Sequence, residues 1–173
     1  MGQIVIYFWQ MCLLRVGPQK LPRSVPILAF IFVVYFLIAA FTIGLTRPGQ
    51  DLFGILGGAM FGVIMEAGIL WLLLLYKNVT WRFVATMSAL LGTNAIILLI
   101  LLPMNLILIN VDAESTIRFL TEIASLLCLG WWLAIAGSIL HHAINISILQ
   151  GAAIIFVMEL VTVVATRAIF PVS

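Results

Sequence analysis

Charged side chains are scarce in this sequence. Only 8% of its 173 residues are charged and 65% are apolar, whereas a soluble domain averages about 25% charged residues. A soluble fold of this length could not bury so much apolar surface, so lipid must cover part of it. No stretch is left for a separate soluble domain, which argues against a nucleotide-binding or catalytic domain. The net charge of +2 is too small to indicate a nucleic-acid partner.

Residues that could hold a metal or a cofactor are also few. Cys12 and Cys128 lie far apart and match no metal or redox spacing. His141 and His142 are adjacent, so on a helix their side chains would point about 100° apart, which suits joint metal ligation poorly. We interpret the histidines as capping or interfacial groups and leave a metal or proton role open. No cofactor, metal ligand or catalytic residue is predicted, and we expect a protein that is not an enzyme.

Long apolar runs, broken by short polar or Pro/Gly segments, are what the sequence has in abundance. Each span of a bilayer needs about 20 such residues, and the 54 residues from Ile117 to Phe170 fit two spans with a turn at 141–145. Pro103 removes a backbone donor, so we expect a kink near 99–103. The sequence predicts an all-α integral membrane bundle. Its five spans are expected at 26–45, 51–76, 81–109, 117–140 and 146–169.

The first 25 residues contain an apolar run that is too short to cross a membrane. It extends from Ile4 to Leu14 and carries Tyr7 and Trp9, whose rings favour the headgroup region. Three prolines and a glycine then forbid a continuous helix before the first span. We therefore divide the chain into an interfacial amphipathic helix with a Pro/Gly-rich turn, residues 1–25, and a transmembrane domain, residues 26–170.

Basic residues near the ends of the spans indicate an orientation. Five lie on the side of the N-terminus and three on the other side, which favours a cytoplasmic N-terminus and an external C-terminus. The first set consists of Arg15, Lys20, Arg23, Lys77 and Arg82, and the second of Arg47, Arg118 and Arg167.

Small residues repeat along the second span. Gly54, Gly58 and Gly62 recur at four-residue spacing. Glycine costs about 1 kcal/mol relative to alanine inside a helix, so several glycines on one face indicate close approach of another helix. That helix could belong to the same chain, or the glycine face could bind a membrane-protein partner or a second copy.

Two carboxyl groups and one amide lie inside spans. At about 1.5 Å per residue, Glu66, Asn94 and Glu159 each lie about 15–20 Å from one end of their helices, near the middle of the bilayer. No Lys or Arg is placed at that depth to neutralise them, and an ionised carboxylate there is costly. We predict a polar cluster of Glu66, Asn94 and Glu159. It would either fix helix packing through hydrogen bonds or sense a proton or cation.

The order of these elements resembles that of the Yip-domain (Ypt-interacting) membrane proteins. An amphipathic pre-helix followed by five closely spaced spans is similar to that family. So are the third span, Ala85 to Ile109 with Pro103, and the fourth span around Gly130-Trp131-Trp132, which runs almost directly into the fifth. The resemblance covers about residues 26–170 and implies the same topology, with the N-terminus inside and the C-terminus outside. The segment from Leu14 to Pro22 looks more like that of small bacterial inner-membrane proteins.

Two functions follow as expectations. The glycine face and the lack of a catalytic constellation favour a non-enzymatic scaffold or adaptor, whose partners would be the lipid bilayer and another membrane protein or a homo-oligomer. The alternative is a small proton- or cation-linked transporter or channel subunit that uses Glu66 and Glu159. The expected location is the bacterial inner membrane.

Overall fold

Helices account for the secondary structure of the part of the chain that the structure describes. The computed structural model describes residues 2–21, 23–46, 52–112 and 114–170, so the expected start of the second span at residue 51 lies outside it. Among these residues, five helices are long and apolar enough to cross a membrane, which confirms the all-α five-span class. The helices are α1 (Gly2–Cys12), α2 (Val25–Thr46), α3 (Leu52–Tyr76), α4 (Phe83–Asn110), α5 (Thr116–Ile144) and α6 (Ile148–Ile169), and two 3-10 turns, η1 (Pro18–Lys20) and η2 (Thr80–Arg82), lie before α2 and α4.

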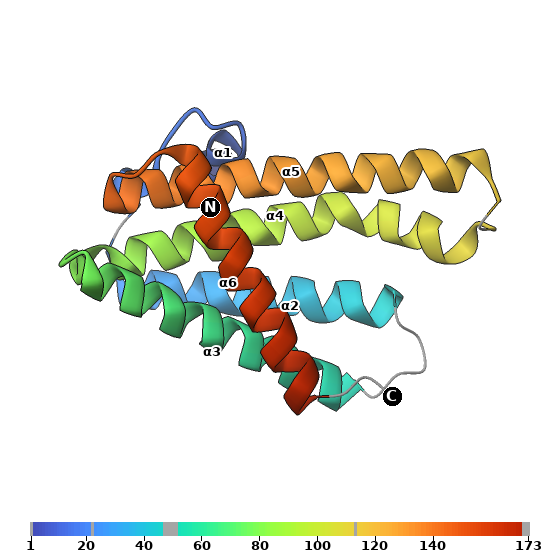
Figure 1. Cartoon of the computed structure of the whole chain (residues 1–173), viewed down its shortest axis with the longest axis horizontal. Coiled ribbons are helices and arrows are strands. Elements are labelled where there is room, and N and C mark those ends of the chain that lie inside the picture. The colour runs from blue at the N-terminus through green and yellow to red at the C-terminus, as the bar shows by residue number, and fades with distance from the viewer. Residues whose placement is uncertain (1, 22, 47–51, 113, 171–173) are drawn as a thin grey trace.

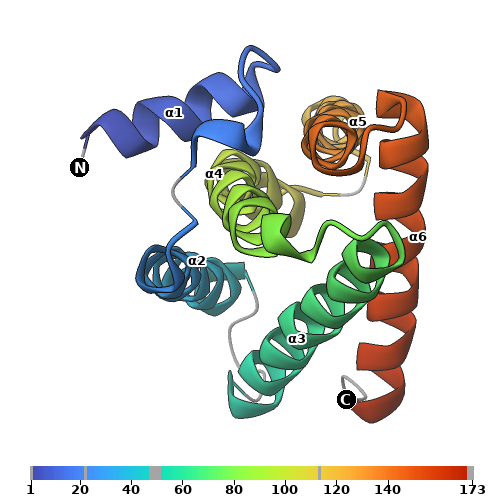
Figure 2. The same ribbon diagram turned by 90° about the vertical axis from the view of Figure 1, so that its left-hand side faces the viewer.

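Helices α2, α4 and α5 lie nearly parallel to one another, and α3 and α6 run obliquely to them. Figure 1 shows α4 and α5 side by side with α2 below them, while α6 crosses their direction. In Figure 2 the same three helices are seen nearly end-on, and α3 and α6 extend across the view. Helix α4 continues through Pro103 as one helix of 28 residues, and the kink expected there stays a prediction.

The connection between α5 and α6 is shorter than expected. Asn145 adopts a left-handed conformation with φ of 56° and ends α5, a role that asparagine tolerates better than most residues. Two residues later Ser147 and Gln150 form a capping box that starts α6. His141 and His142 therefore lie in the last turn of α5, where we had expected the loop.

Helices α5 and α6 cross one another instead of packing side by side along their whole length. A Cβ atom on Gly137 would lie 2.6 Å from the carbonyl oxygen of Ile148 and 2.7 Å from the amide nitrogen of Ala152, and one on Gly151 would overlap the Gly137 backbone. The two backbones thus touch at one crossing point, as small residues permit in membranes. Beyond it the helices diverge, and the second half of α6 packs on α3.

Helix α1 runs across the direction of α4 and α5 (Figure 2), and its interfacial position stays a prediction. Its Phe8 ring fills the space above Gly92 of α4, where a Cβ atom would overlap it. The indole nitrogen of Trp131 on α5 donates a hydrogen bond of 2.9 Å to the carbonyl oxygen of Cys12. These contacts bury Cys12 completely and attach α1 to both helices.

We predict that alanine at position 137 destabilises the fold, because its methyl group would push the α6 backbone away. Gly137→Ala should lower the free energy of unfolding by about 1–3 kcal/mol. The matched control is Gly130→Ala on the same helix, where a Cβ atom meets nothing within 4 Å and the change should be neutral or stabilising by up to about 1 kcal/mol. Denaturant titration in mixed micelles measures both, and equal effects would contradict the crossing.

Cys12 provides a test of the docking of α1. Burial raises the pKa of the Cys12 thiol to about 11, so near neutral pH the reactive thiolate is rare, and alkylation should speed up as the pH rises towards that value. In a Cys128→Ser background, we expect maleimide labelling to be at least about tenfold slower than in the unfolded chain.

Gly92→Leu should displace Phe8 and speed this labelling, whereas Gly68→Leu, at a glycine with open space around it, should not. Fast labelling of the folded parent protein would show that α1 is not attached as described.

Candidate functional site

The packing of α3 on α6 brings two carboxyl groups together. Gly58 faces Thr166, and Gly62 faces Thr162, with ordinary or slightly tight spacing for an added Cβ atom. The helices run in opposite directions here, so one further turn along each brings Glu66 of α3 opposite Glu159 of α6. The small residues thus set the helix separation at which the two carboxyl groups can meet.

The side chains of Glu66 and Glu159 lie close enough to interact with one another. Both side chains are partly buried. Two carboxylates have only acceptors, so a hydrogen bond between these groups requires that at least one of them carries a proton. Within an apolar bundle that proton also removes part of the cost of placing two negative charges side by side. The pair is therefore a candidate for holding a proton.

Tyr35 of α2 lies close enough to both carboxyl groups to interact with them electrostatically. Its phenol brings a hydroxyl group into the same polar layer from a third helix. The sequence signal for it was available, because Tyr35 lies ten residues into α2, about 15 Å along the helix and near the depth estimated for the carboxyl groups.

Asn94 lies in the same region but has a different partner. Its side-chain oxygen accepts a hydrogen bond of 2.6 Å from the indole nitrogen of Trp132 on α5. The expected cluster of Glu66, Asn94 and Glu159 is thus divided into two neighbouring pairs, a carboxyl pair and an amide–indole pair. The role of Trp132 could not be read from the sequence, because Trp131 and Trp132 were equally placed to face the bundle.

A cavity of about 430 Å³ connects the two pairs. It lies where α6 diverges from α5, and α2 and α4 form its floor. A volume of this size is in the range of small-molecule sites, and exposed Phe156, Leu160 and Leu129 form part of its wall, so it opens on the lipid-facing surface. We call it the Glu159 cavity; its lining residues are Tyr35, Asn94, Ile97, Leu98, Leu101, Leu129, Trp132, Phe156, Glu159, Leu160 and Val163.

The glycine face of α3 is occupied from within the chain. Gly58 and Gly62 contact Thr162, Thr166 and Phe170, and Gly54 is partly buried near the start of the helix. Of the two interpretations made from the sequence, packing inside the subunit describes Gly58 and Gly62. No free surface at these two glycines remains for a second molecule.

The adjacent histidines hold the end of α5. Nδ1 of His142 donates a hydrogen bond of 2.7 Å to the carbonyl oxygen of Ser138, and Nδ1 of His141 pairs with the carbonyl oxygen of Ile146. Within the described ranges no three His, Cys, Asp or Glu side chains gather as a metal site would require. The capping interpretation of His141 and His142 agrees with these contacts.

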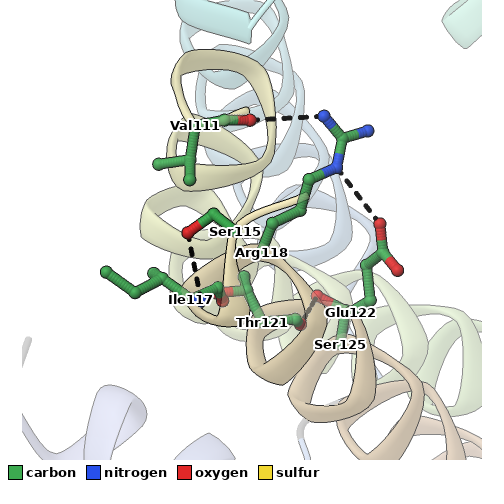
Figure 3. A network of polar contacts seen from close by, with 7 residues as sticks. All are labelled: Val111, Ser115, Ile117, Arg118, Thr121, Glu122 and Ser125. Atoms are coloured by element: carbon green, nitrogen blue, oxygen red, sulfur yellow. Dashed lines mark hydrogen bonds and ion pairs between the residues drawn. The ribbon is translucent and has the colours of Figure 1, made fainter. Parts of the chain in front are cut away.

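A separate polar network lies at the opposite end of α5 and is drawn in Figure 3. Nε of Arg118 lies 3.3 Å from a carboxylate oxygen of Glu122, and Nη1 of Arg118 donates to the carbonyl oxygen of Val111 at the same distance. Ser115 caps the helix by accepting a hydrogen bond from the amide of Ile117. The ion pair is largely exposed and contributes little to stability, which makes its residues suitable controls.

Comparisons with known proteins give no relative. No protein-family model matches the chain, and no match is found among curated proteins or solved structures. The resemblance to the Yip-domain proteins therefore stays a prediction from the order of the helices.

A double-mutant cycle tests the carboxyl pair. Glu66→Leu and Glu159→Leu should each destabilise the fold, because each leaves the other carboxyl group without its partner. The double variant should lose less than the sum of the two, with a coupling free energy of about 1 kcal/mol. Glu122→Leu combined with Glu159→Leu is the control and should be additive. Additive effects in the main cycle would contradict the interaction between the two carboxyl groups.

Proposed function

We propose that the chain is a small, non-enzymatic membrane transport protein that exchanges protons for a lipophilic cation bound in the Glu159 cavity. One observation carries the proposal: two adjacent, partly buried carboxyl groups, one of which lines a cavity of ligand size with an exposed apolar rim. An ionisable residue inside a span is costly and is a functional candidate by default. Helix packing alone explains why threonines of α6 face glycines of α3, but it does not explain the cavity beside them.

The coupling follows from electrostatics. A cation that enters the Glu159 cavity favours the carboxylate form of the Glu66–Glu159 pair, and in a medium of low dielectric constant this interaction is strong. The pair then loses its shared proton. Conversely, a proton that returns to the pair removes the negative charge and weakens the binding of the cation. Proton and cation thus compete for one site, which is the thermodynamic requirement for exchange.

The lining residues define the substrate class. Apart from Glu159, the cavity wall is aliphatic or aromatic except for the phenol of Tyr35, the amide of Asn94 and the indole nitrogen of Trp132. Aromatic rings attract cations through their π faces, and Tyr35, Trp132 and Phe156 line the same cavity as the carboxyl group. A strongly hydrated metal ion would find few oxygen ligands here. An organic cation of one positive charge with an apolar body fits the charge, the size and the lipid-side opening.

The scaffold function, which was the first expectation, has less support. It depended on a glycine face that would bind a partner, and Gly58 and Gly62 contact α6 instead. A second copy of the chain remains part of the proposal, because five spans leave little room for a complete pathway.

We further propose the bacterial inner membrane as the location, with the N-terminus in the cytoplasm, on the basis of the basic residues near the span ends.

Binding of tetraphenylphosphonium, a lipophilic cation, tests the proposal. Isothermal titration calorimetry on the detergent-solubilised protein should show binding that tightens as the pH rises, because protons compete for Glu66 and Glu159. Among the cavity-lining residues only Tyr35 and Glu159 are titratable, and Glu66 faces them from α3. In weakly buffered solution, binding should release protons.

Glu159→Gln should weaken binding at least about tenfold and abolish proton release, since a removed counter-charge is worth more than 1 kcal/mol in a site of low dielectric constant. Glu122→Gln, in the exposed network, is the matched control and should bind as the parent does. Equal binding of the neutral analogue triphenylphosphine oxide, or unaltered binding by Glu159→Gln, would refute the proposal.

A further inference from the structure

Two arginines share one tryptophan ring where α4 begins. The guanidinium carbon of Arg23 lies 4.1 Å from the centre of the Trp81 ring, and that of Arg82 lies 4.6 Å from it. Both contacts are cation–π interactions. They bring two positive charges close together, an arrangement that is stable only if something offsets their repulsion.

Hydrogen bonds to the end of α5 fix the position of Arg82. Its Nη1 donates hydrogen bonds of 3.1 Å and 2.8 Å to the carbonyl oxygens of His142 and Ala143. These carbonyls belong to the last turn of α5, where backbone acceptors lack helical partners and carry partial negative charge. Nε and Nη2 of Arg82 and the whole guanidinium of Arg23 have no acceptor among the described residues.

A small cavity of about 100 Å³ lies beside this pair. It has no carboxylate in its wall, and the sequence contains no Asp or Glu in residues 1–50, 67–111 or 123–158. The chain therefore supplies no counter-charge of its own at this end of the bundle. The cavity is lined by Pro18, Gln19, Arg23, Trp81, Arg82, Ala85, Thr86, His142 and Ala143.

We propose that this cavity binds the phosphate group of an anionic membrane phospholipid. Guanidinium groups match phosphate oxygens with paired hydrogen bonds. The depth fits a lipid headgroup, because Trp81 and the turn η1 lie at the ends of the spans, where tryptophan marks the membrane interface. Clusters of basic residues at that level recognise anionic headgroups.

The site is independent of the Glu159 cavity and shares no residue with it. Its test uses the whole protein in nanodiscs made from phosphatidylcholine with a small, varied fraction of phosphatidylglycerol of the same acyl chains. Native mass spectrometry after release counts the retained lipids. The parent protein should retain phosphatidylglycerol in preference to phosphatidylcholine.

Arg23→Gln should reduce that preference about fivefold, the worth of one basic residue at a membrane surface. Arg118→Gln removes the same charge at the opposite end of α5 and should leave the preference unchanged. Thermal unfolding of each variant establishes that it is folded. Because Arg23 is exposed and has no hydrogen-bonding partner in the described chain, Arg23→Gln should unfold at the temperature of the parent.

Three results would overturn the proposal: equal retention of both lipids, an unchanged preference in Arg23→Gln, or an equal loss in Arg118→Gln. Inorganic phosphate at millimolar concentration is a further arm. If it displaces the retained phosphatidylglycerol completely, the site is one for a free anion instead of a lipid headgroup. Persistence of the lipid in the presence of phosphate supports the lipid headgroup.

Discussion

The backbone contact between Gly137 and Gly151 determines the arrangement of the rest of the bundle. Neither residue can carry a Cβ atom without overlap with the facing helix, so α5 and α6 meet at a single point and then separate. The separation has two consequences: it leaves the Glu159 cavity open between the helices, and it directs the second half of α6 onto α3. Helix–helix association in lipid gains little from the hydrophobic effect. Close approach of two backbones is therefore the main interaction that sets where two membrane helices cross.

The carboxyl pair depends on that crossing. Glu66 and Glu159 lie on helices that are adjacent only because α6 turns away from α5. The contacts of Gly58 with Thr166 and of Gly62 with Thr162 set the spacing at which the two carboxyl groups interact. Under the proposed function, this pair at the edge of an open cavity differs from a purely structural cluster because its charge would depend on what occupies the cavity. Trp132 and Asn94 form a hydrogen bond with one another, so the part of the cavity wall that they form does not compete for that proton.

The other end of the bundle follows a different rule. There the basic residues are not neutralised by the chain, and aromatic rings and the terminal carbonyls of α5 hold them in position. The end of α5 thus anchors η2 through Arg82, and its two histidines order the α5–α6 turn. Under the proposed lipid site, this end of the bundle also presents positive charge at the depth of the headgroups. Under the two proposals, protons neutralise the carboxyl pair in the interior and a lipid phosphate neutralises the arginines at the boundary, because an unpaired charge is costly at each depth.

Hydropathy by itself determined the five long helices and the short helix α1, and it predicts the depth of Glu66, Asn94 and Glu159, because span length and helical rise convert residue number into position across a bilayer. Only the tertiary structure decided which helices are neighbours, that Asn94 pairs with Trp132, that Tyr35 joins the carboxyl groups, and that α6 crosses α5 at Gly137 and Gly151. In a soluble helix the apolar stripe reveals the buried face. In this chain lipid and protein interior are equally apolar, so the sequence carries almost no sign of the direction in which each helix faces, and that information resides in the packing of a few small residues.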